Sequence, residues 1–225
     1  MQPYAVIVAG GSGTRMGTDK PKQFLELQGR PLIAHSVQAF LDAYAELIPI
    51  IVLPEAWLEE GKAILGAIFP DRPIHYTTGG ETRFHSVQRG LEQIPGEGIV
   101  FVHDAVRSIV SVSLIRRCYT AALETGSAIP VVPVRDSLRV LTAAGNQPIN
   151  RELVRAVQTP QTFLVSKLRE AYAQPYRPAF TDEATVAEAA GQPVSLVEGE
   201  ESNIKITYPV DLLVAGEWLS RRSDP

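Results

Sequence analysis

The sequence has very little cysteine: one residue, Cys118, in a chain of 225. A single thiol can form no disulfide within the chain and no cysteine cluster for zinc. We therefore expect a protein of a reducing compartment, with the cytoplasm as its location. The four histidines show no metal-ligand spacing either, so we expect no transition-metal site.

Long hydrophobic runs and an excess of basic residues are also missing. No basic leader precedes the short apolar run at 5–9, and no run approaches the ~18 residues that a membrane span needs. Lys and Arg number 21 against 25 Asp and Glu, a net charge of -4, whereas nucleic-acid binding requires a basic face. We expect a protein that is neither exported nor in a membrane and that has no nucleic-acid partner. A few local cations must then bind any anionic ligand.

Hydrophobic residues make up 45% and charged residues 20% of the chain, as in ordinary globular proteins. Its length favours one large domain, residues 1–225, over two small ones. Runs rich in Val and Ile alternate with segments of helical spacing, which predicts an α/β fold with a Rossmann-like, doubly wound, mostly parallel sheet. The predicted strands are 4–9, 48–53, 74–78, 99–103, 128–134, 194–197 and 203–207. The predicted helices are 32–41, 57–69, 86–94, 114–123, 166–173, 182–190 and 209–221.

The alternation breaks at residues 135–161. This segment holds scattered Val and Leu residues, a turn-like Ala144-Gly145-Asn146 and no helical period. The pattern predicts a projecting β-arm within the single domain. Because a two-stranded arm is only marginally stable alone, we expect it to pack against another surface, such as that of a second subunit.

A glycine-rich loop, residues 9–17 (AGGSGTRMG), directly follows the first predicted strand. Glycines let backbone N–H groups approach a phosphate, and open α/β sheets bind ligands at the carboxyl ends of their strands. The loop is no dinucleotide fingerprint, because Met16 stands where a glycine is required, and it lacks the Gly-Lys-Ser/Thr of a Walker loop. Arg15 and Lys22 add two permanent cations. They are either phosphate ligands or a solvated pair of surface charges.

Asp104 comes directly after the fourth predicted strand, again at a carboxyl end. A carboxylate there suits Mg²⁺ bridging nucleotide phosphates, since magnesium needs only one or two protein carboxylates besides phosphate and water. The alternative is a residue that only caps or turns the loop. His103 is interpreted as a packing residue at the end of the strand.

Six motifs occur in the order found in one enzyme family. They are residues 9–17 with 21–25 (PKQFL), 79–87 (GGETRFHSV), 102–107 (VHDAVR), 133–137 (PVRDS) with 158–161 (QTPQ), 181–184 (TDEA) and 203–207 (NIKIT). Together they resemble the 2-C-methyl-D-erythritol 4-phosphate cytidylyltransferases, which are polyol-phosphate cytidylyltransferases. Gly10 departs from the family's usual alanine, Ser108 from its common proline and Ser137 from its frequent threonine. These departures bear on the identity of the polyol more than on the type of reaction.

The resemblance implies a nucleotide-diphospho-sugar transferase-like fold and a CTP-dependent nucleotidyltransferase of non-mevalonate isoprenoid biosynthesis. The reaction joins CTP and 2-C-methyl-D-erythritol 4-phosphate into 4-diphosphocytidyl-2-C-methyl-D-erythritol and releases pyrophosphate. The resemblance also implies catalysis by Arg15 and Lys22, Mg²⁺ on Asp104, and nucleotide binding by Ala9, Gly10, Gly11, Gly13, Gly80, Glu81, Ser86 and Ala105. The implied contacts of the polyol phosphate are Arg107, Ser137, Arg151, Thr159, Thr181 and Lys205. In the family the arm crosses to a partner, so a homodimer is implied in which Arg151 completes the neighbour's site.

Two alternatives stay open. Ribitol-5-phosphate cytidylyltransferases share the glycine loop, Pro-Lys-Gln and the aspartate loop, although residues 150–152 followed by 158–161 resemble the methylerythritol enzymes more closely. A nucleotide-binding module could instead have kept the fold and lost catalysis, because fold alone implies no activity. Against this, a module that only binds has no need of Arg15, Lys22, Asp104 and Lys205 together.

Overall fold

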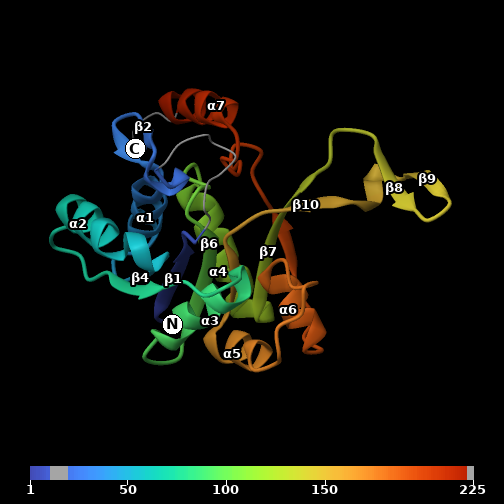
Figure 1. The fold of residues 1–225 in the computed structure, drawn as a ribbon. Coiled ribbons are helices and arrows are strands. Elements are labelled where there is room, and N and C mark those ends of the chain that lie inside the picture. The colour runs from blue at the N-terminus through green and yellow to red at the C-terminus, as the bar shows by residue number, and fades with distance from the viewer. Residues whose placement is uncertain (11–19, 222–225) are drawn as a thin grey trace.

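The computed structural model describes residues 1–10 and 20–221. A twisted sheet runs through the molecule with helices on both faces (Figure 1). Its strand order is β10-β7-β11-β6-β1-β4-β5, and β12 pairs with β7 beside this path. The strands are β1 (Pro3–Val8), β4 (Ile48–Leu53), β5 (His75–Thr78), β6 (Ile99–Asp104), β7 (Ser127–Pro133), β10 (Arg155–Val157), β11 (Gln161–Leu164) and β12 (Leu196–Glu198). The predicted α/β class with a mostly parallel central sheet is confirmed.

Alternate side chains of the central strands enter two hydrophobic layers, one on each face. In β1, Ile7 packs with helices α1, α2 and α4, whereas Val6 packs with α3, α5 and α6. Strands buried on both faces account for the nearly continuous apolar runs in the sequence. The helices are α1 (Leu32–Ala43), α2 (Leu58–Ile68), α3 (Arg83–Glu92), α4 (Val112–Thr125), α5 (Val165–Tyr172), α6 (Glu183–Ala189) and α7 (Pro209–Ser220).

Short elements join this frame. They are the 3₁₀ turns η2 (Lys22–Phe24), η3 (Glu55–Trp57) and η4 (Arg151–Leu153) and the small strands β2 (Glu26–Leu27) and β3 (Arg30–Pro31). A third, smaller hydrophobic cluster joins Leu27, Val106 and Ile206 with Ala215 of α7. This cluster fastens the last helix near the residues that follow β6. In the described part of the chain, no helix is long and apolar enough to span a bilayer.

The order in which the chain adds strands creates a switch point at β1. From β1 the chain continues to β4 and β5 on one side and then crosses to β6 on the other. Val8, at the end of β1, is in register with Val52 of β4 and with Asp104 of β6. In open α/β sheets the loops separate at such a point, which leaves a crevice for a ligand.

The strand β11 was not predicted as a strand. It lies between β6 and β7 and runs antiparallel to both. Its polar residues hid it, because Gln161 and Thr162 are buried although they carry no hydrophobic signal. Gln161 finds its partners in α6 and its cap, donating to Asp182 at 2.9 Å and accepting from the N–H of Ala184 at 2.8 Å. The buried amide of Gln161 is thus hydrogen-bonded, which allows a polar residue at a central position of the sheet.

The predicted strand 203–207 is wrong, since the segment is extended but belongs to no sheet. It crosses beyond the ends of the strands and makes one backbone hydrogen bond to the loop after β6, from Ile206 N to Val106 O at 3.0 Å. The alternation that suggested a strand has another cause. Ile206 is fully buried in the third cluster, whereas Lys205 between the two isoleucines is exposed.

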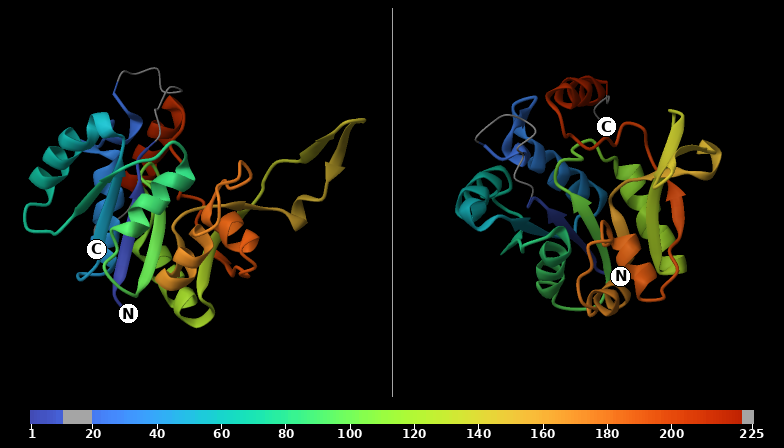
Figure 2. Two further views of the ribbon diagram at one scale, coloured as in Figure 1. Left: turned by 60° about the horizontal axis from the view of Figure 1, so that its bottom comes forward. Right: turned by 45° about the vertical axis from the view of Figure 1, so that its right-hand side comes forward.

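A hairpin of β8 (Leu138–Thr142) and β9 (Gly145–Ile149) projects from the rest of the chain, as the left view of Figure 2 shows. The end of the predicted arm returns to the sheet instead, because β10 pairs antiparallel with β7. Leu138, Val140 and Ile149 lie on one face of the hairpin by their register, and the last two are 42% and 41% exposed. The hairpin thus carries apolar side chains that residues 1–10 and 20–221 leave partly exposed.

Close packing of α3 on the sheet predicts opposite effects for two helical glycines. An added Cβ at Gly90 would lie 2.5 Å from Val6 Cγ1, whereas at Gly66 of α2 nothing lies within 4 Å. Gly66→Ala should raise the free energy of unfolding by ~0.5–1 kcal/mol, because alanine is the better helix former. Gly90→Ala should lower it by ~1–3 kcal/mol through overpacking against a stiff valine. Urea unfolding of both variants measures this, and equal stabilisation by the two would contradict the packing described.

Candidate active site

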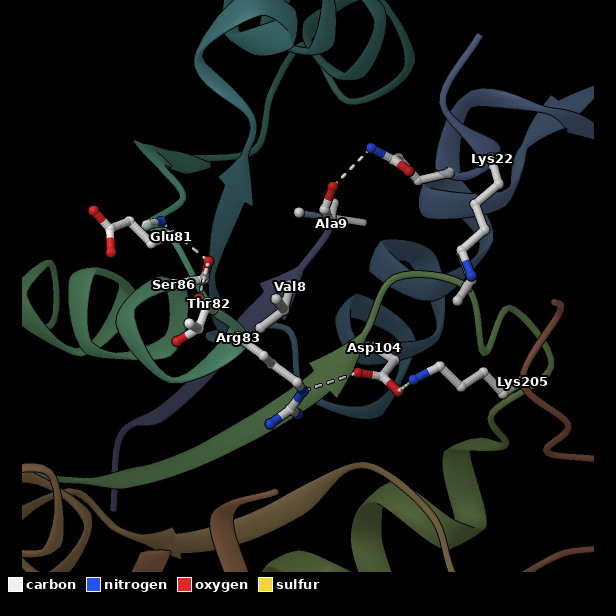
Figure 3. Close-up of a pocket in the computed structure, with 13 residues that line it drawn as sticks. Val8, Ala9, Lys22, Glu81, Thr82, Arg83, Ser86, Asp104 and Lys205 are labelled. Atoms are coloured by element: carbon white, nitrogen blue, oxygen red, sulfur yellow. Dashed lines mark hydrogen bonds and ion pairs between the residues drawn. The ribbon is translucent and has the colours of Figure 1, made fainter. Parts of the chain in front are cut away.

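A cavity of about 240 Å³ opens at the switch point (Figure 3). Its walls come from the end of β1, from η2, from the turn before α3, from the end of β6 and from the segment before α7. The lining residues are Val8, Ala9, Gly10, Lys22, Gln23, Gly80, Glu81, Thr82, Arg83, Ser86, Asp104, Val106 and Lys205. Five of these lining residues are charged: Lys22, Arg83 and Lys205 are positive, and Glu81 and Asp104 are negative.

Asp104 is the last residue of β6, and its carboxylate lies among three cations. Oδ2 is 2.8 Å from Lys205 Nζ and 3.9 Å from Arg107 Nε, and Oδ1 is 3.4 Å from Arg83 Nε. Burial alone would raise the pKa of Asp104, but the three cations outweigh burial and hold that pKa well below its usual range. The carboxylate is therefore ionised at any pH where the protein functions.

The loop after β6 is held from below by Thr159. Its hydroxyl accepts the N–H of Asp104 at 3.1 Å and lies 3.0 Å from His103 Nδ1. His103 is buried against the ring of Phe40, which agrees with its interpretation as a packing residue. Arg107 donates to the carbonyl of Asn203 at 2.7 Å. These bonds join the aspartate loop to the segment that carries Lys205.

The opposite wall is a glycine turn closed by a serine. Ser86 Oγ accepts the N–H of Gly80 at 3.1 Å and donates to the carbonyl of Thr82 at 3.0 Å. A Cβ at Gly80 would lie 2.4 Å from the Cβ of His85, so no other residue fits there without a shift. A Cβ at Gly10 would lie 3.6 Å from Ser86 Oγ, an ordinary contact. The alanine that is usual at this position would therefore fit this backbone.

Lys22 enters the cavity from η2 and is 9% exposed. Its Nζ lies 3.4 Å from the carbonyl oxygen of Ile206. The neighbouring Gln23 donates to the carbonyl of Ala9 at 2.7 Å, which ties η2 to the end of β1. A buried ammonium held this way is aimed at the cavity before any ligand arrives.

The donor set fits one kind of metal. In the ranges 1–10 and 20–221, no three His, Cys, Asp or Glu side chains come close enough to form a metal site. Two carboxylates line the cavity, the exposed Glu81 and the buried Asp104, and Asp104 lies among the cations. Such a site fits Mg²⁺ that takes its remaining ligands from phosphate and water. The three cations around Asp104 repel a bare metal ion, so the site favours a metal that arrives with the negative charge of phosphate oxygens.

The family of the chain follows from comparison with known proteins. A family model described as 2-C-methyl-D-erythritol 4-phosphate cytidylyltransferase matches residues 4–221. The chain belongs to this family. The enzyme of that name from Bacteroides thetaiotaomicron is 45% identical over 219 residues, which are 97% of this chain and 100% of the relative. The enzyme of that name from Geobacillus kaustophilus is 38% identical over 226 residues, 99% of each chain.

Solved structures of enzymes of this family are also similar to the chain. The 4-diphosphocytidyl-2C-methyl-D-erythritol synthase of Anaerococcus prevotii superposes with a TM-score of 0.83 at 27% identity, covering 98% of this chain and 99% of that one. The 2-C-methyl-D-erythritol 4-phosphate cytidylyltransferase of Thermus thermophilus superposes with a TM-score of 0.73 at 34% identity, covering 96% and 98%. The chain is therefore a CTP-dependent nucleotidyltransferase of this family.

The structure brings together many of the residues that the sequence predicted for the site. Those that line the cavity are Ala9, Gly10, Lys22, Gly80, Glu81, Ser86, Asp104 and Lys205. Ala105, Arg107 and Thr159 lie directly behind Asp104. Ser137, Arg151 and Thr181 are exposed and do not line it. Gly11, Gly13 and Arg15 lie outside the described residues.

Two charged residues of the site were missed by sequence reasoning. Arg83 lines the cavity, and Glu183 lies behind it with no exposure. Both belong to motifs that were recognised, at 79–87 and 181–184. Nothing in the local pattern shows that they meet, since they are 100 positions apart. Ser108 has a structural role, because its hydroxyl donates to the carbonyl of Leu32 at 2.9 Å in the interior.

Burial of His103 predicts a pH dependence of stability. Burial lowers the pKa of His103 to about 4, from 6.5 in the unfolded chain. Between these values the unfolded state binds the proton and the folded state does not, so stability falls as the pH falls from about 6.5 to 4. The loss should reach ~3 kcal/mol. Urea unfolding without divalent cations measures it, and His103→Gln should remove this part of the slope. Parallel pH curves for the variant and the original chain would contradict it.

Proposed function

We propose that this chain transfers the cytidylyl group of CTP to 2-C-methyl-D-erythritol 4-phosphate and releases pyrophosphate. The observation that carries the proposal is the cavity at the switch point, where Lys22, Asp104 and Lys205 meet the Gly80 turn in a chain of this family. The cavity has the charge that two phosphate-bearing substrates require, with cations on three of its walls.

The reaction requires two anions to approach each other. A phosphate oxygen of the polyol phosphate attacks the α-phosphorus of CTP, a new P–O bond forms, and the bond to the pyrophosphate oxygen breaks. Such a transfer needs little covalent help from the protein, so positioning and charge stabilisation carry it. The burial of Lys22 and the hydrogen bond from Gln23 to Ala9 at the end of β1 support this role for Lys22. Arg15, from the glycine-loop motif, is the second cation of the proposal.

The Gly80 turn is proposed to read the base. Its backbone is held by Ser86, and glycine lets the backbone approach the ring edge of cytosine closely. Glu81 lies beside it on the cavity wall. Ala9 and Gly10, with Gly11 and Gly13 of the motif, are proposed to face the phosphates, and Ala105 the ribose side.

Asp104 is the proposed Mg²⁺ ligand. The ion would neutralise part of the triphosphate charge when bound. The carboxylate is ionised and at the cavity, as a ligand of a hard cation must be. Lys205 occupies one of its oxygens in this structure, and its side chain is 45% exposed, so the ammonium can turn toward a substrate phosphate. Arg107 and Thr159 support this side of the cavity, and Ser137 and Thr181 complete the proposed polyol contacts.

A homodimer through the arm is part of the proposal. The uncovered apolar face of the hairpin favours a partner, because a two-stranded ribbon is marginal by itself. Arg151 lies at the base of the hairpin, where its guanidinium donates to the carbonyl of Arg135 at 2.6 Å. It is exposed and is not on the wall of its own cavity. A second copy would bring it to the polyol phosphate. A cytoplasmic location, suggested by the lone cysteine, is proposed with it.

Pyrophosphate release tests the reaction directly. With CTP and Mg²⁺, the chain should release pyrophosphate with methylerythritol phosphate at a kcat/KM at least ~100-fold above that with ribitol phosphate, since a site built around one polyol's hydroxyls rejects another. UTP should replace CTP poorly. Preference for ribitol phosphate would establish the alternative substrate, and CTP binding without any pyrophosphate release would identify a module that only binds nucleotide.

Co-expression of two inactive variants tests the dimer and the roles of Lys22 and Arg151 together. Lys22→Ala should lower kcat about a thousandfold, or ~4 kcal/mol, and Arg151→Ala on the order of a hundredfold. When the two are co-expressed, each mixed dimer keeps one intact site, so roughly a quarter of the original activity should return. The control Lys62→Ala, on the exposed face of α2, should keep full turnover. No recovery in mixed dimers would show that Arg151 does not act across subunits.

A further inference from the structure

Arg83 is held from behind by a carboxylate that lies outside the cavity. Nη1 lies 2.5 Å from Glu183 Oε1, and Nη2 lies 3.0 Å from Oε2. Glu183 is fully buried, at the first turn of α6. Tyr172 of α5 donates its hydroxyl to Oε1 at 3.1 Å. A bidentate pair of this kind fixes both the position and the plane of the guanidinium.

Since Glu183 holds both Nη atoms of Arg83, Nε is the nitrogen that faces Asp104 in the cavity. Its Nε lies 3.4 Å from Asp104 Oδ1 (Figure 3). Arg83 is the first residue of α3, and that helix is anchored by Phe84, which stacks on Tyr172 with ring centroids 4.6 Å apart. Helix α3 and the consecutive helices α5 and α6, far from it in sequence, therefore determine where one nitrogen points.

The two oxygens of Asp104 are held in different ways. Oδ1 faces Arg83, whose side chain is 26% exposed and locked by Glu183. Oδ2 faces Lys205, whose side chain is 45% exposed and ends in a single rotatable ammonium. A ligand that draws Lys205 away leaves Oδ2 with only the longer contact to Arg107 Nε, at 3.9 Å, while Arg83 still holds Oδ1.

Glu183 also limits the positive charge around Asp104. Arg83, Arg107 and Lys205 surround one carboxylate, and a divalent cation approaching it would be repelled by all three. The negative charge of Glu183 offsets that of Arg83 at short range, and this offset is strong because neither group is fully solvated.

We infer that Glu183 is a positioning residue: through the fixed guanidinium of Arg83 it orients Asp104 so that Oδ2 is the oxygen exchanged between Lys205 and a divalent cation that enters with the nucleotide. The inference rests on the proposed metal role of Asp104. Tyr172 supports Glu183 in this arrangement. Neither residue touches the cavity itself.

Mn²⁺ serves as the probe, in the full-length protein with CTP and without polyol phosphate. Water-proton relaxation reports the Mn²⁺ that is bound to the protein. Glu183→Gln keeps the shape of the side chain but removes its charge, and should weaken Mn²⁺ binding in the ternary complex about tenfold. CTP affinity without metal should change less than twofold. Arg83→Lys keeps the positive charge but cannot form the bidentate pair with Glu183. It should therefore weaken Mn²⁺ binding as Glu183→Gln does.

Matched variants separate a positioning role from a structural one. Glu188→Gln, on the exposed side of the same helix, should bind Mn²⁺ as the original chain does. Tyr172→Phe removes only a hydroxyl and should weaken Mn²⁺ binding about threefold. It carries the test if Glu183→Gln does not fold by circular dichroism. Folded Glu183→Gln or Tyr172→Phe protein with unchanged Mn²⁺ affinity would overturn the inference.

Asp104→Asn distinguishes this inference from the function on which it rests. If Asp104→Asn binds Mn²⁺ normally with CTP, Asp104 is not the metal ligand and the proposed role itself fails. If Asp104→Asn loses Mn²⁺ while Glu183→Gln and Tyr172→Phe keep it, only the positioning role of Glu183 fails.

Discussion

The charge of one partly buried carboxylate constrains the whole site. Asp104 is removed from most of its water, which opposes ionisation, and it stays ionised because Arg83, Lys205 and Arg107 surround it. These cations come from α3, from the segment before α7 and from the loop after β6. If any of these parts moved, the carboxylate would lose a partner that offsets its desolvation. The arrangement also leaves an excess of positive charge at the cavity, which is the condition for binding phosphates.

The topology explains why these parts meet. β1 and β6 are neighbours in the sheet, and their carboxyl ends stop in register at Val8 and Asp104. The strand order reverses at β1, and in open α/β sheets a crevice opens at the carboxyl ends of the strands at such a point. The segment 203–207 then closes it from above, because Ile206 is buried beside Val106 and Lys205 is left facing Asp104. This geometry fits the reaction of the family, in which two phosphate-bearing substrates must be brought together by cations.

Polar groups in the interior keep the loops in place. Thr159 binds the backbone of Asp104, Gln161 binds the start of α6, and Gln158 donates to the carbonyls of Glu200 and Asn203 at 2.8 and 3.3 Å. These three residues all lie within the QTPQ motif, residues 158–161. Their role is to join the sheet to the loops that carry the site, and their lack of hydrophobicity is why the strand that contains Gln161 escaped prediction.

The sequence by itself determined the α/β class and the main helices, and its motifs singled out the glycine turn, Lys22, Asp104 and Lys205, which the structure brings to one cavity. Periodicity is a local property and motifs are written along the chain, so both can be read in order. Only the tertiary structure decided that Arg83 meets Glu183, that β11 lies between β6 and β7, and that 203–207 crosses the strand ends without joining a sheet. Those outcomes depend on which buried polar groups find partners across long separations, and no local pattern records that choice.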